Sequence, residues 1–401
     1  MKHLIIRNIG PLNEADITLK KVNVIIGPQS SGKSCVLKVA CYCTWVEKRI
    51  ELTQDPSFFE KENVFINELV RFHKLKSYIK ADTYIEYESD CMHFSYSRQT
   101  GQFKFEWKNR WGYTRSKVTY IPAERNMVAV IPNWFEVKLA DDNIRDFMSD
   151  WETARKATAQ QLEVLNLGVS YHYEESSRAD KVRIESGEEL DFTDTSSGLQ
   201  SLIPLYVHLN YLDKLQYEQT KSESVQREGE NWELLRHIYS ILFEKDAIDK
   251  LRKSGFFSKK NKGITIPQDM PTELFGAVGL LFADQASANR CKDIYTRYTG
   301  NHFCDIFLEE PEENLFPPTQ TQLTDWLLDL TEGPHASNLF IATHSPYILT
   351  SLLERQDIGL GLFFTNPEGM PNVSTATEED IQEIYDYGVD AFFNLETLNR
   401  K

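Results

Sequence analysis

Eight residues near the N-terminus have the types and spacing of a phosphate-binding loop. Residues 27–34 fit the pattern G-x-x-x-x-G-K-[ST], with a β-branched strand before them and an apolar helix after them. Glycines let such a loop turn its N–H groups towards phosphate oxygens, and the helix start adds partial positive charge. We expect Lys33 to neutralise the β- and γ-phosphates of a nucleotide and the Ser34 hydroxyl to ligate Mg²⁺. The predicted phosphate-binding set is Gly27, Pro28, Gln29, Ser30, Ser31, Gly32, Lys33, Ser34 and Cys35.

Two adjacent carboxylates, Glu309 and Glu310, end an apolar run at residues 306–308 and are followed at once by Pro311. Buried charge is unfavourable, so acids at the end of an apolar strand need a compensating partner. A phosphate loop requires a second metal-binding acid on a neighbouring strand, and we assign this role to Glu309. Glu310 would be the general base, because burial and its neighbour's charge both raise its pKa. The alternative is a solvated acidic turn.

A histidine, His344, follows a second apolar strand at residues 339–342. A lone histidine is usually structural. Here it follows a phosphate loop and an acidic pair in chain order, so we predict that it donates a hydrogen bond to the γ-phosphate. The predicted catalytic residues are therefore Lys33, Glu310 and His344.

The elements that must position these groups form an α/β fold. The strands are apolar on both faces, which is typical of a largely parallel sheet covered by helices. Residues 82–109 alternate in polarity and predict antiparallel strands. Residues 135–165 predict a helix, and a polar segment further on predicts helices around a loop at Gly229. The core strands are expected at 2–9, 22–26, 118–121, 305–308, 339–342 and 360–365.

The chain is expected to form one domain over residues 1–401. The nucleotide-binding core takes residues 1–48 and 300–350, and an antiparallel lobe is inserted at 49–116. A mainly helical insertion follows at 200–300, and a closing segment at 351–401. No long heptad run predicts a coiled coil.

Four motifs together resemble those of the ABC-type ATPases, in particular the SMC-like and OLD-like branch. They are Walker A at 27–34, a signature-like "DTSSGLQSL" at 194–202, Walker B at "FLEEPEENLFP" and the switch histidine His344. The resemblance implies a P-loop head that hydrolyses ATP with Mg²⁺. It also implies a head-to-head homodimer with ATP between the copies. The signature residues that would contact the nucleotide are Ser196, Ser197, Gly198 and Gln200.

Some positions depart from the family pattern. The first Walker B acid is usually Asp, whereas this chain has Glu309, and OLD-like relatives tend to have His where Asn314 and Phe316 stand. The segment "TYIPAERNM" resembles the stretch after the Q-loop in OLD-like proteins. It places Arg125 either near the nucleotide or in a surface ion pair. The residues after His344 are too few for the TOPRIM nuclease domain of OLD-type nucleases.

Composition excludes several other classes. The formal net charge is −16, which repels nucleic acid, and no apolar run approaches the roughly 20 residues of a membrane span. The six cysteines include no C-x-x-C pair, so we expect neither a zinc site nor disulfides, and a cytoplasmic location. One basic stretch, "KLRKSGFFSKKNKG", carries Lys250, Arg252, Lys253, Lys259, Lys260 and Lys262. It predicts either a nucleic-acid contact or a solvated loop, and the acidic chain favours the loop.

Three functions remain open, and a fourth, a membrane transporter subunit, is disfavoured because the long insertions are unlike a transporter head. The first is an ATPase that dimerises on ATP and regulates a separate effector, a nuclease or toxin, as in prokaryotic anti-phage systems. The second is a repair-type ATPase that acts directly on DNA. The third is a scaffold that only binds nucleotide, which Glu310 and His344 argue against.

Overall fold

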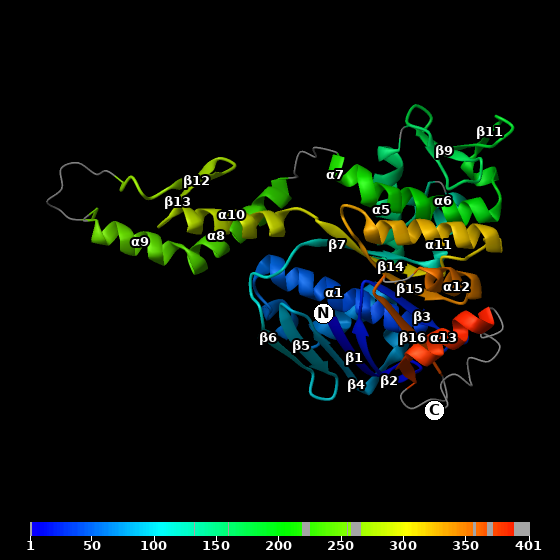
Figure 1. Ribbon diagram of the computed structural model, residues 1–401, viewed down its shortest axis with the longest axis horizontal. Helices are drawn as coiled ribbons and strands as arrows, with labels where there is room; N and C mark the ends of the chain where they lie inside the picture. The colour runs from blue at the N-terminus through cyan, green and yellow to red at the C-terminus, as the bar shows by residue number, and fades with distance from the viewer. Residues whose placement is uncertain are drawn as a thin grey trace.

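A large mixed sheet organises the protein in the computed structural model (Figure 1). The structure describes residues 2–131, 133–158, 160–218, 225–254, 256–257, 266–355, 358–366 and 372–388. The sheet has 11 strands in the order β6-β5-β4-β1-β2-β17-β16-β3-β15-β14-β7. This is the α/β fold with a parallel core and an antiparallel lobe that the sequence predicted.

Five strands form the parallel half of the sheet. Neighbouring strands in this half are all parallel: β16 pairs with β3, β3 with β15, β15 with β14 and β14 with β7. The six core strands predicted from sequence are all present, five of them in this half and one, β1, in the other. The bounds are β3 Val22–Ile26, β7 Ser116–Ile121, β14 Phe303–Glu309, β15 Asn338–Thr343 and β16 Leu360–Thr365.

The parallel strands bury both faces, as their apolar sequences require. Val24 faces one hydrophobic core and Ile25 faces the other, and the same alternation separates Ile306 from Phe307. Helices cover the two faces: α1 (Lys33–Thr53) and α3 (Val64–His73) on one, and α5, α6, α11 and α12 on the other. The second set spans α5 Asn143–Ala157, α6 Ser197–Asn210, α11 Pro317–Glu332 and α12 Pro346–Glu354.

The other half of the sheet is antiparallel. It joins the parallel half at β17, which pairs antiparallel with β16 and, in parallel, with β2 through the single residue pair Val373↔Ala15. Two asparagines reinforce this junction: the Asn13 amide N–H donates to Asn372 Oδ1, and the Asn372 amide N–H donates to Asn13 Oδ1, both at 3.0 Å. The bounds are β1 Lys2–Ile9, β2 Leu12–Leu19, β4 Ile79–Glu88, β5 Met92–Ser97, β6 Gln102–Trp107 and β17 Val373–Thr375.

A second, four-stranded sheet begins within the last residues for which a helix was predicted. The helix expected over 135–165 is shorter at both ends: Asp142 caps its start by accepting from the Ile144 and Arg145 amides, and α5 ends at Ala157, before β8. The strands that follow pair antiparallel in the order β11-β10-β9-β8. Their bounds are β8 Leu162–Glu163, β9 Ser170–Glu174, β10 Ala179–Arg183 and β11 Glu189–Asp191.

A helical arm projects from the body (Figure 1). It contains α8 Val225–Leu242, α9 Glu244–Lys253, α10 Gln285–Thr299 and a hairpin of β12 Thr272–Phe275 and β13 Val278–Leu281. The loop predicted at Gly229 is wrong, because Gly229 lies within α8, where a lone glycine costs about 1 kcal/mol. Of the basic stretch, Lys250, Arg252 and Lys253 end α9, whereas Lys259, Lys260 and Lys262 lie outside the described residues.

Several short elements complete the chain. They are α2 Ser57–Glu60, α4 Met127–Val130, α7 Gln216–Glu218, α13 Glu378–Tyr387, the 3₁₀ turns Lys76–Tyr78, Ala123–Asn126, Trp134–Glu136 and Phe192–Asp194, and the π-helical turn Tyr211–Leu215. None of the described helices is both long and apolar enough to cross a bilayer. All six cysteines are buried as free thiols.

Candidate functional site

The carboxyl ends of three parallel strands place the predicted catalytic groups at one edge of the sheet. In register, Thr343 pairs with Ile26 and Glu309 pairs with Ala342. The loop after β3, the acids after β14 and the histidine after β15 therefore leave the sheet side by side. Crevices at the carboxyl ends of parallel strands are where such sheets bind ligands.

The loop after β3 has a backbone that needs its glycines. Gly27 has φ +156° and Gly32 has φ +103°, a region that other residues rarely adopt. A Cβ on Gly27 would lie 2.4 Å from the Thr365 carbonyl oxygen, and one on Gly32 would lie 2.5 Å from a Leu12 methyl. Gly32 is also the N-cap of α1, and no side chain caps that helix. The first amides of α1 are thus left to a ligand, which suits an anion.

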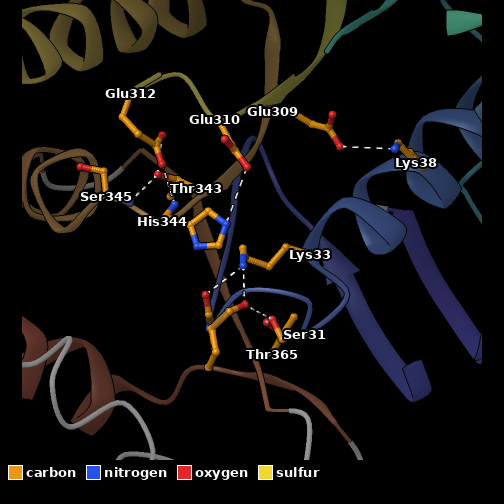
Figure 2. Close-up of polar contacts among 12 residues, drawn as sticks. Ser31, Lys33, Lys38, Glu309, Glu310, Glu312, Thr343, His344, Ser345 and Thr365 are labelled. Atoms are coloured by element: carbon orange, nitrogen blue, oxygen red, sulfur yellow. Dashed lines mark hydrogen bonds and ion pairs between the residues drawn. The ribbon is translucent and has the colours of Figure 1, made fainter. Parts of the chain in front are cut away.

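Lys33 is folded back onto its own loop. Its Nζ donates to the Gly27 carbonyl at 2.9 Å and to the Pro28 carbonyl at 2.7 Å (Figure 2). Burial lowers the pKa of Lys33 to about 8, and the nearby carboxylates of Glu310 and Glu312 oppose that shift. An ammonium held by neutral carbonyls in a partly dry site gains from an incoming phosphate. Lys33 can therefore supply charge neutralisation at this loop.

Thr365 supports the loop from β16 and was not singled out by sequence. Its hydroxyl hydrogen-bonds with Ser31 Oγ, and Ser31 Oγ also donates to the Pro28 carbonyl at 2.7 Å. No motif marks this threonine, because its contact with Ser31 spans 334 residues of chain.

Glu309 and Glu310 point in different directions from adjacent positions (Figure 2). Glu309 is 6% exposed, and its Oε1 lies 3.7 Å from Lys38 Nζ of α1. Glu310 has φ +43° and donates its backbone N–H to the Ala342 carbonyl at 2.8 Å. Its side chain reaches 3.7 Å from His344 Nε2, on the side where Lys33 lies.

Burial raises the pKa of Glu310, the direction expected from sequence. The negative charges of Glu312, Glu309 and Glu313 raise it further, and Lys33 opposes them. A carboxylate with a raised pKa accepts a proton more readily near neutral pH, which suits a general base. Burial lowers the pKa of His344, and the charge of Lys33 lowers it further, so the neutral imidazole is favoured.

Glu312 positions His344 and was missed by sequence. Its Oε1 accepts the backbone N–H of His344 at 2.7 Å, and its Oε2 accepts the Thr343 hydroxyl at 2.8 Å. Ser345 then caps α12, accepting from the amides of Tyr347 and Ile348. The only signal in the sequence is that Glu312 belongs to the acidic run after β14.

The signature-like residues lie on a different element, at the start of α6. Ser196 is the N-cap and accepts from the Leu199 amide at 3.4 Å, and both Ser196 and Ser197 are exposed. Gln200 Nε2 donates to the carbonyls of Thr193 and Thr195, at 2.9 and 3.0 Å. The Ser196 hydroxyl and the Gln200 side-chain amide therefore form hydrogen bonds within the turn that begins α6.

The surface ion pair considered for Arg125 is wrong, whereas a place near the nucleotide stays a prediction. Arg125 is 0% exposed, so it is not part of a surface ion pair, and its guanidinium donates to backbone carbonyls that include those of Glu309 and Glu310. It therefore contacts the acidic turn from inside the protein.

The predicted metal ligands are compatible with Mg²⁺. Ser34 and Glu309 offer a hydroxyl and a carboxylate, the hard oxygen donors that Mg²⁺ prefers. Glu309 Oε1 is buried and has no hydrogen-bond partner among the described residues. The part of the chain that the structure describes holds no group of three or more His, Cys, Asp or Glu side chains suited to a metal. A bound Mg²⁺ would therefore take its remaining ligands from phosphate and water.

Comparisons with known proteins show distant likenesses. No protein-family model matches the sequence, and a search of curated proteins finds no relative. Among solved structures, the chain is similar to the SMC head domain from Thermotoga maritima at 10% identity and a TM-score of 0.40, covering 93% of this chain and 97% of that one. It is similar to a nucleotide-free ATP-binding cassette from an ABC transporter at 13% identity and a TM-score of 0.27, covering 96% of each. It is also similar to the recombination mediator protein RecF at 12% identity and a TM-score of 0.29, covering 94% and 97%.

Proposed function

We propose that this chain is an ABC-type ATPase that binds ATP at 27–35, hydrolyses it and closes head-to-head with a second copy. The observation that carries the proposal is the meeting of Lys33, Glu310 and His344 at one edge of the parallel sheet. Three segments of chain far apart in sequence supply a cation, a base and a hydrogen-bond donor to one place.

Each side chain at this edge of the sheet has a separate role in the proposed hydrolysis of ATP. Glu310 accepts a proton from water as the water oxygen bonds to the γ-phosphorus, and the bond from that phosphorus to the β-bridging oxygen breaks, releasing ADP. His344 donates a hydrogen bond to a γ-phosphate oxygen, and Lys33 neutralises charge on the β- and γ-phosphates. Ser34 and Glu309 would hold Mg²⁺, which would supply positive charge to neutralise the phosphates.

The dimer is proposed from the resemblance and from exposure. Ser196 and Ser197 face solvent at the N-terminus of α6, where a second copy can reach them. In the proposed dimer, the Ser196 hydroxyl and the Gly198 N–H contact the γ-phosphate held by Lys33 of the opposite chain. ATP then joins the two copies and hydrolysis separates them.

The wider role is proposed from the resemblance to the OLD-like branch. The closed and open states would regulate a separately encoded nuclease or toxin, as in prokaryotic anti-phage defence. The assigned residues supply an ATP site, and the proposal gives the effector activity to a partner.

Substitutions within the site test the ATPase. Lys33→Ala should abolish ATP binding, and Glu310→Gln should retain binding, lower hydrolysis at least ~100-fold and accumulate an ATP-bound dimer on light scattering. Lys104→Ala and Glu106→Gln are matched controls, because both residues are exposed on β6. Hydrolysis by Glu310→Gln at the wild-type rate would reject Glu310 as the base.

Direct action on DNA is the second candidate, favoured by one observation. Arg252 and Lys253 are exposed at the end of α9, on the projecting arm. If DNA is the substrate, duplex should stimulate hydrolysis with a steep salt dependence. Neutralising Arg252, Lys253, Lys259, Lys260 and Lys262 should remove that stimulation. Absence of any DNA effect at low salt would exclude this function.

A further inference from the structure

One buried arginine connects the signature-like helix to the catalytic acids. Arg125 follows β7 in the turn Ala123–Asn126 and is fully buried. Its guanidinium nitrogens donate to five backbone carbonyls: Ser201 at 3.1 Å, Pro122 at 3.4 Å, Glu309 at 3.0 Å, Glu310 at 2.8 Å and Pro311 at 3.4 Å.

The five carbonyls belong to three separate parts of the site. Ser201 lies on α6, Pro122 follows β7, and the other three form the turn that carries the catalytic acids. A guanidinium is planar and rigid, with its donors in a fixed fork, so it fixes these parts relative to one another. Its ion pair with a carboxylate is looser: Glu313 Oε2 lies 3.7 Å from Nη1. Most of the guanidinium's hydrogen bonds therefore go to backbone positions.

The turn that Arg125 contacts is strained at the proposed base. Glu310 has φ +43°, which costs a residue with a Cβ of order 1 kcal/mol or more and persists only when its surroundings impose it. Three hydrogen bonds hold it here: the Glu310 N–H donates to the Ala342 carbonyl, and the Glu310 carbonyl accepts from the Glu313 N–H and from the Arg125 guanidinium. Arg125 thus contributes directly to where the Glu310 carboxylate points.

A second link joins the same two elements. Asn314 Nδ2 donates to Ser201 Oγ at 2.9 Å, and a Cβ on Gly198 would lie 3.0 Å from the Asn314 carbonyl oxygen. The N-terminal half of α6 is therefore held against the acidic turn by a backbone contact, a side-chain contact and close packing. A displacement of α6 must be transmitted to Glu309 and Glu310.

We propose that Arg125 is a positioning residue that couples the placement of α6 to the geometry of the catalytic acids. The proposal rests on the proposed function and deepens it. When α6 contacts the ATP of the opposite copy, Arg125 transmits that contact to the turn that carries Glu310 of its own chain. Each active site then senses occupancy of the other.

Arg125→Lys tests this coupling, because lysine keeps the charge but cannot reach five carbonyls. We expect kcat per folded active site to fall about 10- to 100-fold while KM for ATP stays within about threefold, because Arg125 does not contact the loop at 27–34. In a Glu310→Gln background, Arg125→Lys should also weaken ATP-driven dimerisation by about tenfold or more, followed by light scattering against protein concentration.

Arg155→Lys is the matched control. Arg155 is 4% exposed and pairs with Asp180 at 2.8 Å and Glu152 at 2.6 Å, next to the second sheet. It should lower stability without changing kcat per folded site. Equal losses of kcat in the two variants, or no loss in Arg125→Lys, would overturn the proposal.

Asn314→Gly and Ser201→Ala keep the proposal testable if Arg125→Lys does not fold. Asn314 has φ +59°, so glycine removes its amide without straining the backbone. Each single variant should lower kcat with KM unchanged, and the double variant should lose less than the product of the two. An unchanged kcat in both single variants would overturn the coupling.

The wild-type protein distinguishes this proposal from the proposed function. If the wild type does not hydrolyse ATP, the proposed function is rejected. If it hydrolyses ATP without forming a dimer, Arg125 only positions Glu310, and the link between the two sites is overturned.

Discussion

Removing Glu312 should impair catalysis through His344 without preventing ATP binding. The Glu312 carboxylate accepts two hydrogen bonds, from the His344 backbone and from the Thr343 hydroxyl. Hydrogen bonds to a charged group contribute about 1.5–3 kcal/mol each when buried, and this carboxylate is only partly buried. We take about 2–3 kcal/mol for both together, which corresponds to a factor of about 30–150 in rate.

The assay is steady-state phosphate release, combined with ATP affinity from a fluorescent analogue. Glu312→Ala should lower kcat by about 30- to 150-fold and leave ATP affinity within about threefold. Glu312→Gln should fall between wild type and Glu312→Ala, because an amide oxygen can still accept from the His344 N–H. Asp329→Asn is the control, since it removes an exposed carboxylate that pairs with Arg355 at the far end of α11. A Glu312→Ala variant that keeps half of the wild-type kcat would refute the positioning role.

The other predictions concern pH and backbone strain. In the free enzyme, kcat/KM should fall on the alkaline side as Lys33 loses its proton near pH 8, and on the acid side as Glu310 is protonated at a pKa above its ordinary value. Glu312 raises the pKa of both groups, so Glu312→Gln should shift both sides of the pH profile to lower pH. A Glu312→Gln profile identical to that of the wild type would contradict this prediction. Burial raises the pKa of Glu51 to about 8, so the folded state holds a proton that the unfolded state releases, and stability should fall as pH rises from about 4.5 to 8, by up to about 1.4 kcal/mol per pH unit. Glu51→Gln should flatten that slope in urea unfolding, and an unchanged slope would show that Glu51 is not its source. Gly32→Ala places a Cβ 2.5 Å from Leu12 at φ +103° and should lower ATP affinity by at least about tenfold in titration calorimetry. Gly187→Ala is the control for the loss of a positive-φ glycine, because a Cβ there meets nothing within 4 Å.

The parallel strands could be predicted because their sequences are unambiguous. Residues 22–26 are buried at every position, so both faces read as apolar. By contrast, β2 was not predicted, although its buried Ala15, Ile17 and Leu19 alternate with polar residues in the period-two pattern of a half-buried strand. The strands β8 to β11 have two to five residues each, too short for a periodic signal.

The site was predictable only where one local motif carries the chemistry. The loop at 27–34 has its own signature, and Glu310 and His344 stand at the ends of apolar strands. Glu312 contacts partners 31 and 32 residues away in sequence, Arg125 contacts α6 and the acidic turn 76 to 186 residues away, and Thr365 contacts a partner 334 residues away. Such pairings depend on strand order, which propensity and periodicity do not contain.

The junction between β17 and β2 has a mechanical consequence. Elsewhere in the sheet, neighbouring strands share ladders of three to seven residue pairs, whereas β17 and β2 share the single pair Val373↔Ala15, supported by the side chains of Asn13 and Asn372. The backbone ladder is therefore weakest at this point of the sheet. The lobe and the nucleotide-binding half must be held together mainly by the hydrophobic core that α1 shares with strands of both halves, so helix packing and not strand pairing sets their relative position.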